Sequence, residues 1–291
     1  MRIAFFLTSN GSGEEAPHVS AVTTEIVERL RSMGALVDLL VPETRAWDLA
    51  NIRPEYDLYV LKSKTPLTMS LAGALTMAGA VIVNGYRATV LTKDKVASTA
   101  VLAAAGVPVP PSWTTGRPDL LSRLVNGAPV WIKPSGGSRG RGVFCVRTAG
   151  EMRAVEAQSD PWGLPLPLFA QQGVETSGKD LKVYVVGEKM WAITRPWPAV
   201  TMEDKLGRPA EIPPSVRETA RACGRALGLE LYGVDFLLSG DQSWVVDVNA
   251  LPGFKGPVEA PAAIAHYLHQ RAQGLYRSTG KVRRQLSEAS R

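Results

Sequence analysis

Short apolar runs alternate with longer amphipathic segments over the first ninety residues. The short runs cover residues 2–7, 36–42, 56–62 and 80–84. Between them, apolar residues recur every three or four positions over 20–34 and 68–79, which is the spacing of helices that bury one face. Strands that alternate with helices predict a parallel sheet covered by helices, so we expect an N-terminal α/β domain over residues 1–91.

Two further groups of elements follow. Residues 89–111 predict one Ala-rich helix with Thr92 as its N-cap, ended by Gly106 and several prolines. A strand, a glycine-rich loop, a second strand and a helix complete a subdomain over 92–170. A hairpin, a helix and a last hairpin form another over 171–275, and 276–291 form a basic tail that we expect to be flexible.

Charge and composition narrow the class of protein. The formal net charge is +6, and residues 271–291 alone hold six basic residues against one acidic residue. The rest of the chain is nearly neutral and lacks a stripe of basic and aromatic residues, which argues against a nucleic-acid partner. No apolar run approaches the ~20 residues of a membrane span, so we expect no membrane partner. The sequence leaves a homo-oligomer open.

The chain's compartment follows from two local features. The first apolar run is short for a signal peptide and reaches no small-residue cleavage site, so it reads as a buried strand. Cys145 and Cys223 lie far apart without metal-ligand spacing, which suits a reducing cytoplasm.

The last predicted hairpin, residues 231–253, places three oxygen-bearing side chains together. A turn centred on Asp241 sets Asp235 opposite Asp247 and Gly233 opposite Asn249. Asn249 shares a face with Asp247 because residues two apart on a strand point the same way. Gly233, having no side chain, is expected to leave room above the sheet.

The chemistry of this trio favours a metal ion. Two carboxylates directly opposite each other repel and destabilise a hairpin, so a positive group should lie between them. Asp and Asn supply oxygen ligands, the set that Mg²⁺ takes together with substrate phosphates. The alternative is a pair of solvated acids on an exposed face of the sheet.

Phosphate-binding groups are predicted upstream of that hairpin. Lys133 ends an apolar strand, and a loop with Gly137, Ser138 and Gly140 follows it, where backbone amides can approach phosphate oxygens closely. Lys95 lies near a helix N-terminus, which also suits an anion. The alternatives are a solvated glycine-rich hairpin and a surface lysine. The order of lysine and glycines excludes a Walker loop.

Other polar positions complete the candidate site. Residues 171–174 read as a linker between lobes whose backbone could bind an adenine edge. Lys182 points where phosphates or a substrate carboxylate would lie. Lys62 and Lys64 follow a predicted parallel strand at its C-terminal end, where open α/β sheets bind ligands, so they could hold a substrate acid or be solvated edge lysines.

In order, these motifs resemble those of the ATP-grasp superfamily, and most closely the branch of the ribosomal protein S6 glutamate ligase and related carboxylate-amine ligases. The matching segments are "TKDK", "IKPSGGSRGRGV", "QQGV", "GKDLKV" and "DVNALPG", in this order over about residues 93–256. The resemblance implies an ATP-grasp fold behind an N-terminal parallel-sheet domain. It also implies ATP-dependent ligation of a carboxylate to an amine through an acyl phosphate, with release of ADP and phosphate.

The resemblance also implies roles for individual residues. ATP would be held at its phosphates, its adenine and its ribose, and two Mg²⁺ ions, replaceable by Mn²⁺, would bind the trio. Lys182 and Arg195 are the candidates for holding the acyl phosphate of an amino-acid or peptide substrate, acidic ones included. The implied ligands are, for phosphates, Lys95, Lys133, Gly137, Ser138 and Gly140; for adenine, Gln171, Gln172, Gly173 and Val174; for ribose, Asp180; for metal, Asp235, Asp247 and Asn249.

Three alternatives stay open at the level of sequence. The stretch over 181–200 resembles inositol polyphosphate kinases of the same superfamily, so a small-molecule kinase would use the same site with a hydroxyl acceptor. A catalytically silent ATP-binding protein is another reading. A dinucleotide-binding Rossmann enzyme is suggested by "TSNGSG", although Glu14 and Glu15 would repel a pyrophosphate there.

Overall fold

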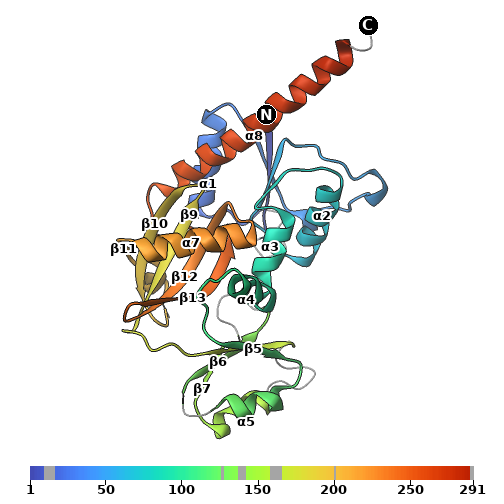
Figure 1. Ribbon diagram of the computed structural model, residues 1–291. Helices are drawn as coiled ribbons and strands as arrows, with labels where there is room; N and C mark the ends of the chain where they lie inside the picture. The colour runs from blue at the N-terminus through green and yellow to red at the C-terminus, as the bar shows by residue number, and fades with distance from the viewer. Residues whose placement is uncertain (10–16, 126–127, 137–141, 158–165, 200, 289–291) are drawn as a thin grey trace.

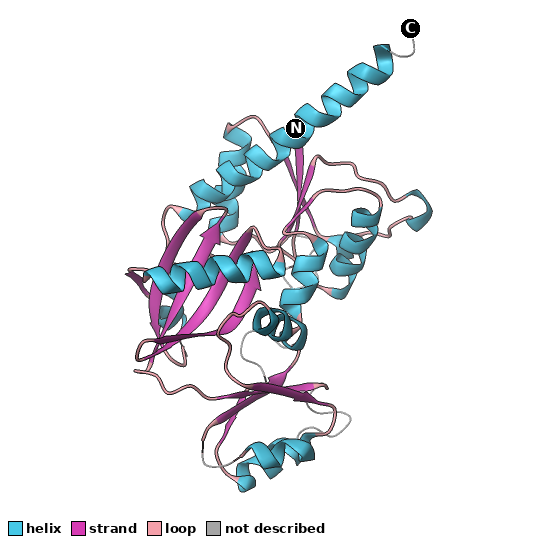
Figure 2. Cartoon of the chain, viewed as in Figure 1, coloured by secondary structure: helices cyan, strands magenta, loops and turns pink. Residues whose placement is uncertain are grey.

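Three β-sheets follow one another through the molecule (Figure 1). The computed structural model describes residues 1–9, 17–125, 128–136, 142–157, 166–199 and 201–288. The sheets hold four, four and five strands, and helices cover their faces (Figure 2).

The first sheet is parallel, as the alternating pattern predicts. Its strand order is β2-β1-β3-β4. Ser20 and Thr65 cap the two long helices, each accepting a hydrogen bond from a backbone amide of the first turn. The elements are β1 (Arg2–Phe6), α1 (Ala21–Ser32), β2 (Leu36–Leu40), η1 (Pro42–Thr44), η2 (Leu49–Asn51), β3 (Leu58–Leu61), α2 (Pro66–Met77) and β4 (Ile82–Val83).

Two helices replace the single Ala-rich helix that the sequence predicts. They are α3 (Tyr86–Lys93) and α4 (Lys95–Ala104), and Asp94 separates them. The Asp94 carboxylate accepts from the amides of Val96 and Ala97 at 2.9 and 3.2 Å. The predicted cap, Thr92, is therefore wrong: it lies inside α3, and its hydroxyl donates to backbone carbonyls one turn back.

The second sheet is small and antiparallel, with strand order β5-β8-β6-β7. Met152 and Val155 of α5 pack against its apolar face. Residues 171 and 172, predicted as a linker, belong to β8, which pairs on both sides. The elements are β5 (Ser112–Thr115), η3 (Pro118–Leu124), β6 (Val130–Pro134), β7 (Phe144–Val146), α5 (Ala149–Ala157) and β8 (Leu168–Gln172).

The third sheet is antiparallel, with order β11-β10-β9-β12-β13, so β13 forms an edge. Helix α7 packs on one face and α8 on the other. The backbone of α8 continues through the basic segment to Glu288 and projects from the body (Figure 1). The elements are β9 (Lys179–Val186), β10 (Lys189–Pro196), α6 (Met202–Leu206), β11 (Arg208–Ala210), α7 (Pro214–Leu227), β12 (Leu231–Ser239), β13 (Gln242–Ala250) and α8 (Ala260–Glu288).

One apolar core joins the first and third sheets. Ile264 and Leu268 of α8 belong to the same cluster as Leu30 of α1 and Val186 of β9. Burial of such side chains stabilises the fold by roughly 1.5–3 kcal/mol each. The N-terminal domain is therefore packed directly onto the large sheet.

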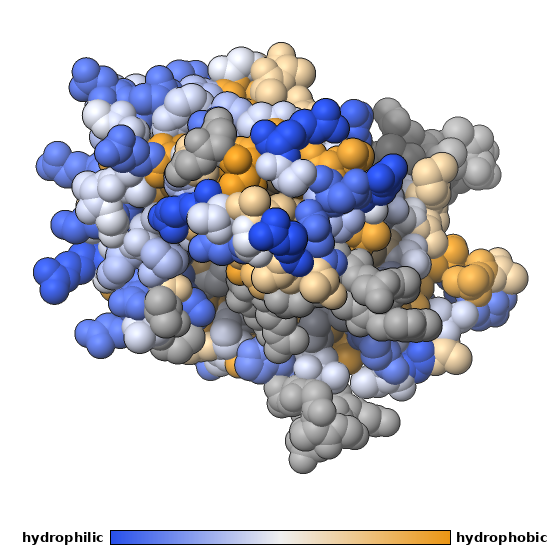
Figure 3. All heavy atoms as spheres, turned by 90° about the horizontal axis from the view of Figure 1, so that it is seen from below, coloured by the Kyte–Doolittle hydropathy of each residue, from blue (hydrophilic) through white to orange (hydrophobic). Residues whose placement is uncertain are grey.

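One face of the molecule is shown with its side chains in Figure 3. On the face seen in Figure 3, hydrophobic side chains surface in small separate groups wherever grey atoms do not cover the view. Within the described part of the chain, every helix is too short or too polar to cross a membrane.

Asn84 fixes the junction between the domains. Its side chain is 1% exposed. Its amide donates to the carbonyl of Leu231 at 2.6 Å, and its oxygen accepts from the amides of Glu230 and Leu231 at 2.8 and 2.9 Å.

Replacing Asn84 should therefore destabilise the protein. We expect Asn84→Ala to lower the free energy of unfolding by about 3 kcal/mol, because it leaves buried backbone groups without partners. Urea denaturation followed by circular dichroism measures this change. Asn51→Ala, at an exposed position, is the matched control and should change stability by less than about 0.5 kcal/mol. Equal midpoints for the two variants would contradict the assignment.

Candidate nucleotide and metal site

The β12–β13 hairpin brings the predicted trio together. Asp235 pairs with Asp247 and Gly233 with Asn249, so the predicted pairing is confirmed. The turn itself differs from the prediction: Ser239 pairs with Gln242, which leaves a two-residue turn. An irregularity in the ladder, where Phe236 pairs with Val245, adds one residue on β13 and restores the predicted register at the acids.

The space above Gly233 is filled. A Cβ atom there would lie 3.2 Å from Cγ of Pro252 and 3.4 Å from Cε of Lys182. The expectation of open room is therefore wrong. The side chains of Pro252 and Lys182 occupy that space, and Lys182 is the direct cross-strand partner of Asp235.

Asp235 is neutralised by two cations. Its Oδ1 accepts from Lys182 Nζ at 2.6 Å and from Arg195 Nη2 at 3.1 Å. Arg195 also holds Asp180 with two hydrogen bonds of 2.9 and 2.5 Å. The predicted positive charge beside the facing acids is thus present, supplied by the two neighbouring strands β9 and β10.

This ion-pair network is largely shielded from water. Asp180 is 2% exposed, and burial raises the pKa of its carboxyl above the usual value, which the hydrogen bonds from Arg195 only partly offset. Both of its oxygens bind Arg195. A ribose, the ligand that the resemblance implies for Asp180, would therefore compete with this pair.

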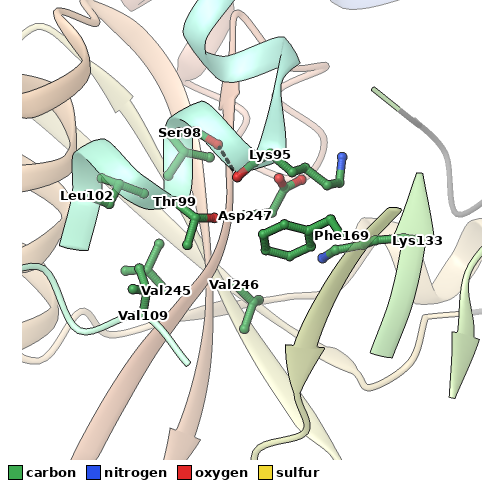
Figure 4. A pocket seen from close by; sticks show the side chains of 11 residues that line it. Lys95, Ser98, Thr99, Leu102, Val109, Lys133, Phe169, Val245, Val246 and Asp247 are labelled. Carbon is green, nitrogen blue, oxygen red and sulfur yellow. Dashed lines mark hydrogen bonds between the residues drawn. The ribbon is translucent and has the colours of Figure 1, made fainter. Parts of the chain in front are cut away.

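A pocket separates the small sheet from the edge of the large one. Lys95 of α4, Lys133 of β6 and Asp247 of β13 line it together with Phe169 of β8 (Figure 4). Lys133 Nζ lies 5.1 Å from the Phe169 ring centroid and 3.5 Å from Oε1 of Gln171. Burial lowers the pKa of Lys133, while attraction by Asp247 works against that shift.

The strand before the glycine-rich loop is tied to the helix that carries Lys95. The backbone amide of Lys95 donates to the carbonyl of Ser135, which ties the start of α4 to the end of β6. Gly137, Ser138 and Gly140, predicted to bind phosphates, lie outside the described residues.

The predicted adenine segment is partly engaged in the small sheet. The amide of Gln172 donates to the Pro111 carbonyl at 2.9 Å, and that of Gly173 to the Pro129 carbonyl at 2.7 Å. A Cβ atom on Gly173 would lie 2.6 Å from Cγ of Pro129, so glycine is required for this approach. An adenine edge would have to use other groups of the segment, such as the backbone of Val174.

The trio suits a hard cation. Asn249 Nδ2 donates to Asp247 Oδ2 at 2.8 Å, so the amide oxygen, the atom that would bind a cation, faces away from that carboxylate. Among the described residues, no three His, Cys, Asp or Glu side chains form a metal cluster. The two acids and one amide therefore need outside oxygen ligands, as Mg²⁺ sites with bound phosphates do.

Lys62 and Lys64 have other partners than those predicted. Lys62 Nζ donates to the carbonyls of Leu251 and Pro252 at 3.3 and 2.8 Å, and Lys64 Nζ to that of Ala250 at 2.7 Å. The alternative of solvated edge lysines is therefore wrong, while a role in holding a substrate acid stays a prediction. Both ammonium groups bind the backbone corner that follows β13.

Phe169 is one of several pocket residues that the sequence did not single out. It lies directly opposite Lys133 in the β6–β8 ladder. A sequence signal for this position exists. If residues 168–172 are taken as a strand, Phe169 and Gln171 lie two positions apart and therefore point to the same face of the sheet, the face toward the pocket.

Comparison with known proteins places this geometry in a family. Residues 92–266 match the model of the RimK-like ATP-grasp domain. Curated relatives named "Probable alpha-L-glutamate ligase" include one from Alkalilimnicola ehrlichii, 27% identical, covering 89% of this chain and 95% of the relative. A similarly named relative from Shewanella amazonensis is 30% identical over 63% of this chain, and the match spans only 64% of that relative's length.

Solved structures share the fold. A RimK domain ATP-grasp protein from Sphaerobacter thermophilus matches with a TM-score of 0.77 at 19% identity, over 93% of this chain and 99% of that one. A D-alanine–D-alanine ligase from Bacillus anthracis matches with a TM-score of 0.67 at 17% identity, over 98% and 99%. With its sheets, its pocket and a family match over more than half its length, this chain belongs to the RimK-like ATP-grasp family.

Proposed function

We propose that this protein is an ATP-dependent carboxylate-amine ligase that activates its carboxylate substrate as an acyl phosphate and releases ADP and phosphate. The family match supports this reading, as do the relatives, which are named glutamate ligases. Neither favours the kinase alternative.

One observation carries the proposal: Asp247 belongs to two clusters at once. It lines the pocket with Lys95 and Lys133, and it faces Asp235 of the ion-pair network. A triphosphate bound between the two lysines would therefore end beside the carboxylates. Phosphoryl transfer depends mainly on such positioning and on electrostatic stabilisation.

The chain's own residues divide the work. Lys95, Lys133 and the glycine-rich loop with Gly137, Ser138 and Gly140 hold the phosphates. Gln171, Gln172, Gly173 and Val174 border the adenine, with Val174 as the backbone contact. Asp180 either contacts the ribose, as the resemblance implies, or positions Arg195.

Asp235, Asp247 and Asn249 would hold Mg²⁺, as two ions for which Mn²⁺ can substitute. When bound, the metal neutralises charge on the transferring phosphoryl group. Lys182 and Arg195 orient the acyl phosphate from the neighbouring strands. Within the described residues, Arg195 Nη1 has no hydrogen-bond acceptor, so it is the donor suited to that role.

The substrates are amino acids or peptides, and the names of the relatives support an acidic one. We also propose a cytoplasmic location, because both cysteines are free thiols, which suits a reducing compartment.

The metal assignment predicts a loss of activity in Asp247→Asn. Removing one carboxylate charge should lower ATP-dependent phosphate release by at least about a hundredfold, with the fold intact by circular dichroism. Asp241→Asn makes the same change in the exposed turn of the same hairpin and should retain activity. Near-normal turnover in Asp247→Asn would reject the site.

The phosphate assignment predicts a similar loss in Lys133→Ala. Because the ammonium group lies in the pocket, we expect nucleotide binding to weaken at least about tenfold by titration calorimetry, with a further loss in turnover. Lys189→Ala, at an exposed position, is the control and should bind like the wild type. Unchanged affinity in Lys133→Ala would exclude Lys133 as a phosphate ligand.

The product separates ligase from kinase. Incubation with ATP, Mg²⁺ and pools of amino acids should release inorganic phosphate and yield a product heavier than the acid by the amine minus water, as measured by mass spectrometry. A product that retains the phosphoryl group would support the kinase instead.

A further inference from the structure

Two lysines of the N-terminal domain hold the backbone of the predicted metal site. Lys62 and Lys64 follow β3 and reach carbonyls 186 to 190 positions later in the sequence. Those carbonyls belong to Ala250, Leu251 and Pro252, which come directly after Asn249. We call these three residues the metal-strand corner.

The corner has an unusual backbone. Leu251 has a φ of 42°, in the left-handed region that costs a branched side chain of this kind about 1 kcal/mol or more. Its amide donates to the Leu231 carbonyl at 2.8 Å, which is the last tie to the sheet. Because Ala250 and Leu251 are buried, their carbonyls need hydrogen-bond donors.

The lysines supply those donors at an energetic cost. Burial lowers the pKa of both Lys62 and Lys64 to about 8, and for Lys62 repulsion by Lys64 adds to that effect. Both side chains are half-buried, and lysines withdrawn from water are normally paired with acids. Within the described part of the chain, Lys62 contacts no carboxylate, so its interactions are the two backbone carbonyls. An apolar side chain of the same size would avoid this desolvation penalty. The lysines are therefore best explained by the hydrogen bonds that they donate to the corner carbonyls.

The corner adjoins both predicted metal ligands. Asn249 is the residue before Ala250, and its side-chain amide donates to Asp247 Oδ2 at 2.8 Å. Because β13 is an edge strand that pairs with β12 on one side, the two lysines add a second support at the end that carries these ligands. From this geometry we infer that Lys62 and Lys64 are positioning residues, through which the N-terminal domain holds Asn249 and Asp247 in place for the metal. The inference rests on the proposed function, because it assumes that these ligands bind Mg²⁺ with a nucleotide.

Lys62 is the better residue to test. Lys64 lies near Asp247, so removing its charge would both loosen the corner and strengthen attraction of a cation. Lys62 lacks that second effect. Lys62→Met keeps the length of the side chain and removes the donor, Lys62→Arg keeps a charged donor, and Lys189→Met makes the same change at an exposed position.

The experiment measures binding of a non-hydrolysable ATP analogue by calorimetry across a range of Mg²⁺ concentrations. We expect Lys62→Met to raise the Mg²⁺ concentration for half-maximal binding about tenfold, the lower end for partners that orient metal ligands. Binding without Mg²⁺ should be unchanged. Lys62→Arg should recover part of the loss, and Lys189→Met should match the wild type.

If the Lys62 contact only stabilises the packing of the two domains, Lys62→Met will lower stability and leave the Mg²⁺ dependence of binding unchanged. That result would overturn the inference. If Lys62→Met does not fold, Lys62→Gln takes its place in the same titration. Hydrogen exchange at the Leu251 amide, which should become faster in the variant, is a second readout. A wild-type protein that binds the analogue equally with and without Mg²⁺ would sink the proposed metal site and this inference together. A normal wild-type response with an unaffected Lys62→Met would sink only the inference.

Discussion

Two carboxylates facing each other across one hairpin impose the main constraint on this structure. Asp235 and Asp247 are direct cross-strand partners, and such like charges repel. Cations offset this repulsion at both acids. Lys182 and Arg195 form ion pairs with Asp235. Lys133 and Lys64 lie close enough to Asp247 for its negative charge to raise their pKa values against the effect of burial. The groups around the two acids thus come from all three sheets: from the segment after β3, from β6, and from β9, β10, β12 and β13.

The electrostatic balance differs between the two acids. Asp235 shares its Oδ1 with two cations at 2.6 and 3.1 Å, and one of these, Arg195, is locked by a second acid, Asp180. Oδ2 of Asp247 instead accepts a hydrogen bond from the neutral side-chain amide of Asn249. Removing a partner from a buried ion pair is usually far more destabilising than the pair is stabilising. The ion pairs therefore hold the Asp235 side chain in place. Asp247, by contrast, lines the pocket.

Contacts between the N-terminal domain and the large sheet are polar as well as apolar. Asn84 satisfies three backbone groups at residues 230 and 231, at the start of β12. Lys62 and Lys64 satisfy three carbonyls at 250–252, at the end of β13. Both sets of contacts lie at the same end of the β12–β13 hairpin, the end that carries Gly233 and Asn249. The N-terminal domain thus helps to shape the site without lining the described pocket.

Local patterns in the sequence determined much of this protein. Alternating strands and helices predicted the parallel first sheet, because this signal depends on neighbouring residues. The Gly-Asp turn predicted the hairpin, but the pairing of Asp235 with Asp247 also needs the irregularity on β13, which offsets the one-residue difference in the turn. Thr92 was mistaken for a cap because the helix break depends on Asp94, two residues away. Only the tertiary structure decided that β8 is a central strand and that Lys62 and Lys64 bind the metal-strand corner. Those contacts join segments up to 190 residues apart, and their partners are backbone carbonyls, which every residue carries and no sequence pattern can single out.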